Sequence, residues 1–387
     1  MKAMKKYSVI LICLLCLIFG VSCSKKEDTA EKNQEQTKSY QTVGDLEISE
    51  KEQEKISEDL LKAAEVYSEQ FKDTELLDET GISAVVSALG ENGYCAIDEE
   101  NQLNMVNADQ LESFLSSLKA EKNEEAVVYL VGDSGELVRL DFYARGGSLV
   151  YIRTVAKWNE RKKPEITYMG GFEAKSWKYT DRGYLFFEKK QAAGYDGETP
   201  YSMIRVSQIS EENRQAAATY IENIGYLNQN LFTSDWTEAD FSGLDLMDLY
   251  EYLYADLYGK HFDADAYQDG IPKEEFEAVF QHYFRISSEK IQELVPFDAE
   301  KQMYQWEERE GADYTSARSL DPEVTEIKDN GDGTLTLTVA VVWAEKETDQ
   351  AFVHKLTVRP LSDGSYQYVS NEVEDSEDNL IPESPGN

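Results

Sequence analysis

The sequence predicts an α+β fold of two units, in each of which helices pack on one face of an antiparallel meander sheet. Apolar residues recur every three or four positions in residues 50–72 and 246–257, which indicates amphipathic helices. From Ala126, and again from Met303, apolar residues instead alternate with polar ones between turn sequences, which indicates hairpins. Runs of helices followed by runs of strands favour an α+β arrangement over alternating βαβ units.

The first unit is assigned to residues 49–207. Its first helix has one apolar stripe, formed by Ile56, Leu60, Ala63, Ala64, Tyr67 and Phe71. Further helices are expected at residues 82–89 and from Asn107 or Asp109 to Leu118. Strands are expected at residues 94–97, 103–106, 126–131, 137–143, 148–158, 165–168, 172–179, 184–189 and 201–206.

The second unit is assigned to residues 208–372. Helices are expected at residues 210–225, at 246–257 after the capping-box form Ser242-x-x-Asp245 and before Gly259, after Pro272, and at 289–295. Strands follow at residues 303–307, 323–327, 334–343, 352–359 and 365–369. This order of elements would suit a cone-like fold of the nuclear-transport-factor type, an analogy that rests on order alone. The acidic residues 373–387 are expected to form a disordered tail.

The N-terminal segment has the features of a signal peptide. Lys2, Lys5 and Lys6 precede the apolar run 8–19, which is too short to span a bilayer. Residues 20–23 (GVSC) resemble the lipobox of bacterial lipoproteins, although Gly20 stands where leucine is usual. The resemblance implies cleavage after residue 22, lipidation of Cys23 and anchoring at the extracytoplasmic side of the cell membrane. An ordinary signal peptide cleaved near residue 22, giving a secreted soluble protein, is the alternative.

Residues 23–48 are polar and mixed in charge, so they are expected to form a flexible tether between the anchor and the first unit. The chain has a formal net charge of −37. Such a charge argues against nucleic-acid binding, which requires Lys and Arg to neutralise phosphates. It also argues against docking of the folded units on anionic lipid.

Few residues offer catalytic or metal-binding chemistry. Without the signal peptide and the lipidated Cys23, Cys95 is the one remaining cysteine; strand parity favours a buried structural thiol over a reactive one. His261, His282 and His354 belong to no zinc or nucleophile motif, so no cofactor or metal is expected. Two Asp-rich stretches, 263–265 and 329–333, have calcium-loop composition but lack the complete ligand pattern.

Charge is segregated along the chain. Residues 126–190 contain 12 Lys and Arg against 8 Asp and Glu, whereas residues 208–300 contain 5 against 20. A basic, aromatic sheet face could bind an anionic or glycan polymer of the cell wall, or an envelope protein. Alternatively, these charges simply solvate the sheet. The candidate ligand-binding face comprises Tyr151, Arg153, Trp158, Lys175, Trp177 and Tyr179.

Three stretches of the second unit resemble a family of uncharacterised clostridial lipoproteins that is classed as a domain of unknown function. They are residues 220–226 (YIENIGY), residues 230–236 (NLFTSDW) and the pair 351–354 (AFVH) and 358–361 (VRPL). The resemblance covers most of the mature chain and implies no activity.

The sequence therefore favours a membrane-anchored lipoprotein with a binding or scaffolding role in the cell envelope. An envelope hydrolase that acts on glycan or peptide wall material through carboxylates is the alternative. A third hypothesis is an accessory lipoprotein that contacts a membrane complex through its acidic helices.

Overall fold

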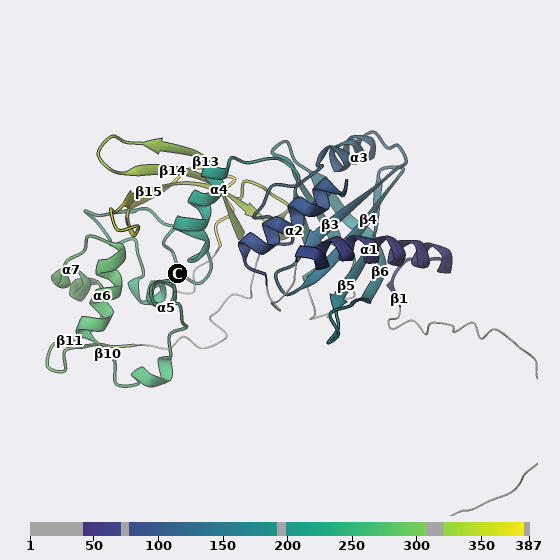
Figure 1. The fold of residues 1–387 in the computed structure, drawn as a ribbon. Coiled ribbons are helices and arrows are strands. Elements are labelled where there is room, and N and C mark those ends of the chain that lie inside the picture. Colours follow the sequence, from purple (N-terminus) through teal and green to yellow (C-terminus); the bar gives the residue numbers. More distant parts are fainter. Residues whose placement is uncertain (1–41, 71–76, 192–198, 307–319, 383–387) are drawn as a thin grey trace, which may run out of the picture. The chain divides into compact units, whose positions relative to one another are not determined.

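Seven α-helices and three β-sheets form in the part of the chain that the structure describes (Figure 1). This structure is a computed structural model, and it describes residues 42–70, 77–191, 199–306 and 320–382. These residues belong to a single compact unit. The predicted α+β class is confirmed.

The first sheet has eight strands in the order β2-β3-β4-β5-β6-β7-β8, with β1 beside β6. Neighbouring strands are antiparallel, except that β2–β3 and β1–β6 are parallel. The strands are β1 Thr42–Gly44, β2 Ala96–Asp98, β3 Glu124–Val131, β4 Glu136–Arg145, β5 Ser148–Trp158, β6 Pro164–Tyr179, β7 Tyr184–Lys189 and β8 Tyr201–Arg205.

Helices cover both faces of this sheet, whereas the sequence predicted helices on one face. Adjacent residues of a strand point to opposite faces. Thus Val128 packs in the core that α3 (Asp109–Lys119) covers, and Tyr129 packs in the core of α1 (Glu50–Gln70) and α2 (Glu79–Glu91) (Figure 1). The central strand β4 is buried along most of its length, so both of its faces require a covering layer.

Strand β6 is one strand of 16 residues, although the sequence predicted two strands on either side of Gly170-Gly171. These glycines allow other groups to approach closely. A Cβ atom on Gly171 would lie 3.1–3.3 Å from Leu46 and Ile48, and a Cβ atom on Gly44 would overlap the Gly171 carbonyl. Residues 42–48, which the sequence assigns to the tether, therefore lie against the sheet, with Ile48 buried.

The second half contains a five-stranded sheet in the order β13-β14-β15-β16-β9 and a small sheet in the order β10-β12-β11. Its strands are β9 Trp236–Thr237, β10 Ile271–Pro272, β11 Phe297–Asp298, β12 Met303–Tyr304, β13 Leu320–Asp329, β14 Leu335–Trp343, β15 Val353–Pro360 and β16 Tyr366–Val373. Its helices are α4 Glu211–Ala217, continued by a π-helical turn Ala218–Glu222, α5 Leu246–Tyr258, α6 Lys273–Tyr283 and α7 Ser288–Leu294.

One aromatic core joins these helices to the five-stranded sheet. Phe276, Phe280 and Leu249 pack with Leu337 and Val339 of β14. Beyond β16, the amide of Leu380 donates to the carbonyl of Ala351 at 2.8 Å, so part of the predicted acidic tail lies on this sheet. No helix in the described residues has the length and apolar content needed to cross a bilayer.

The two halves contact each other through the β6–β7 hairpin. The hydroxyl of Tyr184 donates to Glu323 of β13 at 2.6 Å, and Arg182 forms an ion pair with the same carboxylate. Val342 of β14 packs with Tyr184 and Phe186. These contacts place the start of β13 and the end of β14 beside strand β7.

Candidate functional site

A cavity of about 650 Å³ lies on the α3 face of the first sheet; we refer to it as the sheet hollow. Strands β3–β8 form its floor, and residues 99–101 and 199–200 together with Asp321 and Ala344 form its rim. None of the described residues that line it comes from α3, so it occupies the part of this face that α3 leaves uncovered. Its volume falls within the range of roughly 300–1,000 Å³ that is usual for small-ligand sites.

The floor of the sheet hollow is aromatic and rigid. The ring of Tyr151 on β5 lies 5.5 Å from that of Phe172 on β6 and 5.1 Å from that of Phe187 on β7. All three side chains are buried. Tyr151 and Phe172 are directly opposed in the β5–β6 register, so their shared direction follows from strand pairing. Such packed rings offer an apolar platform that costs little conformational entropy on binding.

Two cations lie over aromatic rings in this hollow. The guanidinium of Arg153 lies 5.9 Å from the ring centroid of Tyr168 and 3.6 Å from a carboxylate oxygen of Glu99. The ammonium of Lys189 lies 4.3 Å from the ring centroid of Phe172. Cation–π contacts of this kind hold the charged groups in place while leaving their N–H groups available as donors.

Carboxylates outnumber the cations in the hollow: Glu99, Glu100, Glu136 and Asp321 line it. Burial raises the pKa of Glu99, and the Glu136 carboxylate raises it further. Burial also raises the pKa of Glu100, with the Asp98 carboxylate as the next cause, and raises that of Asp321 to about 7, with a contribution from Glu100. The hollow thus presents acceptors and donors around an aromatic floor, and its charge balance disfavours a strongly anionic ligand.

Two of the six residues of the predicted binding face, Tyr151 and Arg153, line the sheet hollow. Trp158 lies on the opposite face, because it is an odd number of residues from Tyr151 and Arg153 along β5 and successive side chains of a strand alternate between the two faces. There its ring stacks on Tyr67 with centroids 4.3 Å apart, and its Nε1 donates to Ser68 at 2.7 Å.

The other three predicted residues lie on the distal part of β6, away from the hollow. Lys175 is exposed and pairs with Glu188 at 2.7 Å. Trp177 donates through Nε1 to the carbonyl of Gly147 at 2.9 Å. Tyr179 lies under the ammonium of Lys119, 4.7 Å from its ring centroid. The structure therefore does not bring all six residues together on one surface.

The sequence reasoning missed most of the hollow, including Tyr168, Phe172, Phe187 and the four carboxylates. The register of the β5–β6 hairpin would have identified Phe172 as the partner of Tyr151. No pattern in the sequence signals Asp321, because it reaches the hollow only through the packing of β13 beside the first sheet.

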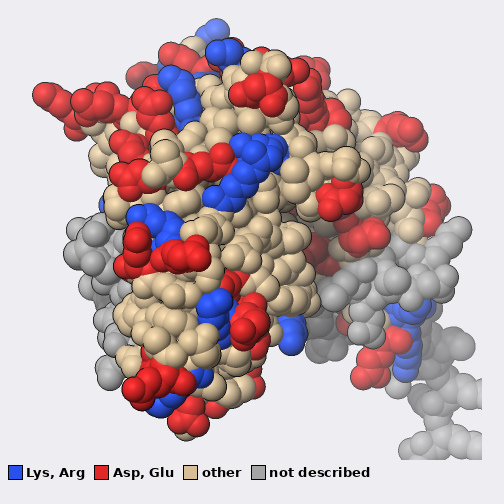
Figure 2. All heavy atoms as spheres, turned by 90° about the vertical axis from the view of Figure 1, so that its left-hand side faces the viewer, with Lys and Arg blue, Asp and Glu red and all other residues tan. Residues whose placement is uncertain are grey.

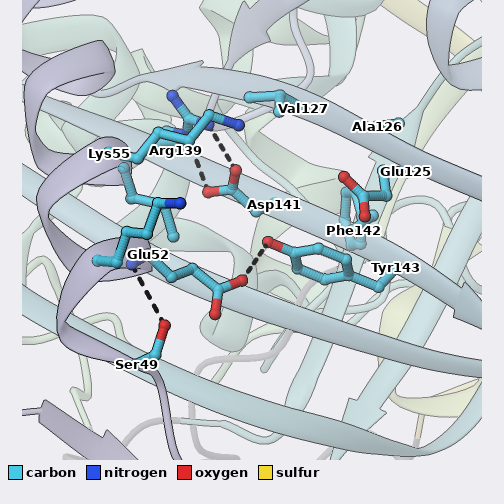
Figure 3. Close-up of a pocket in the computed structure, with 12 residues that line it drawn as sticks. Ser49, Glu52, Lys55, Glu125, Ala126, Val127, Arg139, Asp141, Phe142 and Tyr143 are labelled. Carbon is cyan, nitrogen blue, oxygen red and sulfur yellow. Dashed lines mark hydrogen bonds and ion pairs between the residues drawn. The ribbon is translucent and has the colours of Figure 1, made fainter.

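A second cavity, of about 400 Å³, lies on the α1 face (Figure 3). In this view Arg139 and Asp141 pair with each other, and Glu52 of α1 accepts from the hydroxyl of Tyr143 at 3.1 Å. Arg139 also donates to the hydroxyl of Tyr129 at 3.1 Å. Because these groups satisfy one another, the cavity offers a ligand fewer available polar groups than the sheet hollow does.

The remaining candidates from the sequence have structural partners. The Asn371 amide donates to the carbonyl of Ser234, so its oxygen faces His354 Nδ1 at 2.7 Å, while His354 Nε2 accepts from Tyr226 at 3.0 Å. Burial lowers the pKa of His354 to about 4. Cys95 is buried 3.5 Å from the sulfur of Met105, and burial raises its pKa to about 12.

The Asp-rich stretches 263–265 and 329–333 lie in a 3₁₀ turn and a hairpin turn. In the hairpin, Asp329 accepts from the amide of Gly331 at 2.8 Å, which is an ordinary turn contact. Within the described ranges, no group of three or more His, Cys, Asp or Glu side chains is arranged to hold a metal ion. Residues 1–22 and the predicted lipidation site, Cys23, lie outside the described residues.

The acidic second half is solvated on the face that Figure 2 shows. Asp and Glu side chains are spread over this face, with Lys and Arg between them. Two ion pairs of this half are Lys290–Glu293 and Lys301–Asp298, at 3.1 and 3.8 Å. Such interspersed charge is typical of a surface exposed to water.

Residues 48–385 match a protein family that is described only as a family of unknown function (DUF6070). A search of curated proteins finds no match to the chain.

Proposed function

The chain belongs to the DUF6070 family, and on that premise we propose that it is a lipid-anchored protein of the cell envelope that binds a glycan segment in the sheet hollow. The lipobox-like residues 20–23 support the anchor. The chemistry of the hollow supports the ligand class. The sheet hollow, with its polar groups and aromatic floor, supports a role in binding. The family match by itself assigns no activity.

A glycan is proposed as the ligand because hydrogen-bond donors, hydrogen-bond acceptors and aromatic rings all line the same cavity. Sugar hydroxyls both donate and accept hydrogen bonds, so they complement the Arg153 and Lys189 cations as well as the Glu99 and Glu136 carboxylates. The apolar C–H face of a sugar ring complements an aromatic floor such as that formed by Tyr151 and its neighbours. A polymer rich in phosphate would instead meet more carboxylates than cations.

Calorimetric titration of the purified chain with glycan oligomers tests the binding proposal. Arg153→Ala removes one donor and its ring contact, and should weaken binding about tenfold, a typical effect for loss of a well-placed polar contact. Lys175→Ala is the matched control, because it removes an exposed cation of the same sheet outside the hollow. Equal effects of the two substitutions, or no binding of any oligomer, would contradict the proposal.

The anchor has a separate test. Cys23→Ser should move the protein from the membrane fraction to the soluble fraction, because acyl chains hold a protein through buried methylenes at about 0.8 kcal/mol each. Unchanged membrane retention of this variant would refute the anchor. No observation on the described residues favours the envelope hydrolase, so it is not proposed.

A further inference from the structure

The inner end of the sheet hollow is acidic. Asp321, at the start of β13, lines the sheet hollow and also a smaller cavity of about 20 Å³ behind it. Glu100 lines both cavities as well, and Glu222 of the π-helical turn lines the smaller one. Three carboxylates from three separate segments therefore converge where the two halves of the chain meet.

Asp321 has an unsatisfied oxygen. Its Oδ2 is buried and has no hydrogen-bond partner among the residues that the structure describes. A buried carboxylate oxygen without a partner is unusual, because it loses its hydration without compensation. Burial also raises the pKa of Glu222 to about 7, and the Asp321 carboxylate is the next cause. The group of carboxylates is thus held together at a cost in free energy.

The arginines near the inner end of the sheet hollow bind other groups. Arg205 donates to the carbonyls of Asn101, Leu103 and Ser207 and to the side chain of Asn104. Arg214 pairs with Glu211 and Glu79. Arg182 pairs with Glu323. Among the described residues, none of these arginines forms an ion pair with Asp321, Glu100 or Glu222.

Resting on the glycan-binding function proposed above, we infer that the bound glycan carries a free amino group, which Asp321 and Glu100 hold at the inner end of the sheet hollow. A protonated amine supplies both the missing hydrogen-bond donor and the missing positive charge. A hydroxyl or an acetamido group supplies a donor but no charge, so it leaves the repulsion between the carboxylates in place. The ligand class is therefore a hexosamine polymer with unacetylated residues.

The two ends of the hollow then select one orientation of the ligand. The amine lies at the Asp321 end, and ring hydroxyls accept hydrogen bonds from Arg153 and Lys189 over the aromatic floor. An amine placed beside Arg153 or Lys189 would face like charge. Specificity for the amino sugar thus has an attractive and a repulsive component.

The test is calorimetric titration of the full chain in detergent with two probes of equal length, the tetramers of glucosamine and of N-acetylglucosamine. The glucosamine tetramer should bind at least about tenfold more tightly, since the charged contact is partly buried. Asp321→Asn should abolish this preference.

A control is needed because a chain with a net charge of −37 attracts any cation. Glu326→Gln removes the same charge from an exposed position on the same strand, and it should keep the preference. Near-ultraviolet circular dichroism checks that each variant is folded. If Asp321→Asn does not fold, Glu100→Gln provides the same comparison from the other side of the cavity.

The outcomes separate the two proposals. If neither tetramer binds, the glycan-binding function fails, and the amino-group inference fails with it. Binding of the acetylated tetramer with equal or higher affinity overturns only the amino-group inference. A preference for glucosamine that Asp321→Asn and Glu326→Gln reduce equally also overturns it, because the attraction would then be general rather than local.

Discussion

Arg139 and Asp141 lie two residues apart on β4 and form a two-point ion pair. The Nε–Oδ2 distance is 2.8 Å and the Nη2–Oδ1 distance is 2.6 Å, and both residues are 5% exposed (Figure 3). Residues i and i+2 of a strand point to the same face, so the pair follows from local geometry. Arg139 Nη1 also lies 3.7 Å from Asp59, which links the pair to α1.

Breaking this pair from one side should destabilise the fold. Arg139→Met leaves the Asp141 carboxylate buried without its partner, which typically costs about 3–5 kcal/mol, whereas replacing both residues with Met and Leu should cost less. The free energy of unfolding from urea titrations measures the effect. Lys62→Met is the control, because the Lys62–Asp59 pair is exposed and such pairs contribute about 0–1 kcal/mol. A double variant as unstable as the single one would contradict the argument.

His354 should make stability depend on pH. Its folded pKa of about 4 lies below the ordinary value of 6.5, so the unfolded chain binds more protons between these values. The contribution of His354 to stability is therefore largest above pH 6.5 and falls as the pH decreases towards 4. The loss between pH 7.5 and pH 5 should be about 2 kcal/mol, since one pKa unit corresponds to about 1.4 kcal/mol.

Urea titrations at the two pH values measure this change for the wild type, for His354→Gln and for His282→Gln. The first variant should lose this component of the pH dependence. The second should retain it, because His282 is exposed. Identical pH profiles for all three proteins would show that His354 has the same pKa in the folded and unfolded states, so that it is not buried as described.

The sequence predicted the elements that local rules determine. Gly259 ends α5 with φ of +62°, as the glycine after the apolar stripe indicated. At the other end the N-cap is Asp245, which accepts from the amides of Met247 and Asp248, and not Ser242 of the predicted capping box. The alternation of Leu337, Val339 and Val341 places all three in the core. These features depend on neighbours in sequence, so periodicity and turn chemistry were sufficient to identify them.

One missed feature was within reach of the sequence: Trp158 lies an odd number of residues from Tyr151 and Arg153 on β5, so strand alternation alone places it on the opposite face. The other missed features depend on contacts between distant segments. The sequence predicts that one strand ends before Gly170-Gly171 and another begins after it. In the structure this pair lies within β6, where the missing side chains leave room for β1 and residues 46–48. The candidate site was the least predictable feature, because three of its four carboxylates come from β13 and from the segment after β2, which only the tertiary fold brings beside the sheet.

Asp321 should reduce stability as the pH rises. Its folded pKa of about 7 lies above the ordinary value of 3.8, so the folded chain binds more protons between these values and stability falls across that window. Asp321→Asn removes this loss. At each pH the quantity of interest is the free energy of unfolding of the variant minus that of the wild type. This difference should be up to about 3 kcal/mol larger at pH 7.5 than at pH 4.5, and solvent screening of the partly exposed side chain makes it smaller.

Denaturant titrations of the wild type and of Asp321→Asn at these two pH values measure the gain. Glu326→Gln serves as the reference for a general reduction in negative charge, because its side chain is exposed on the same strand. A gain of equal size in both variants would assign the effect to net charge instead of to the burial of Asp321.

Cys95 should be inert to thiol reagents in the folded protein. The side chain is 1% exposed, and burial raises its pKa to about 12, so almost no thiolate forms at pH 8. With Cys13, Cys16 and Cys23 replaced by Ser, Cys95 is the one cysteine of the chain. A disulfide reagent should then label one thiol in guanidinium and none in native buffer over the time in which free glutathione reacts completely. Because Cys95 packs in the same core as Leu111 and Phe114 of α3, fast labelling of the native protein would mean that α3 separates readily from the sheet, and the sheet hollow could not then have a rigid aromatic floor.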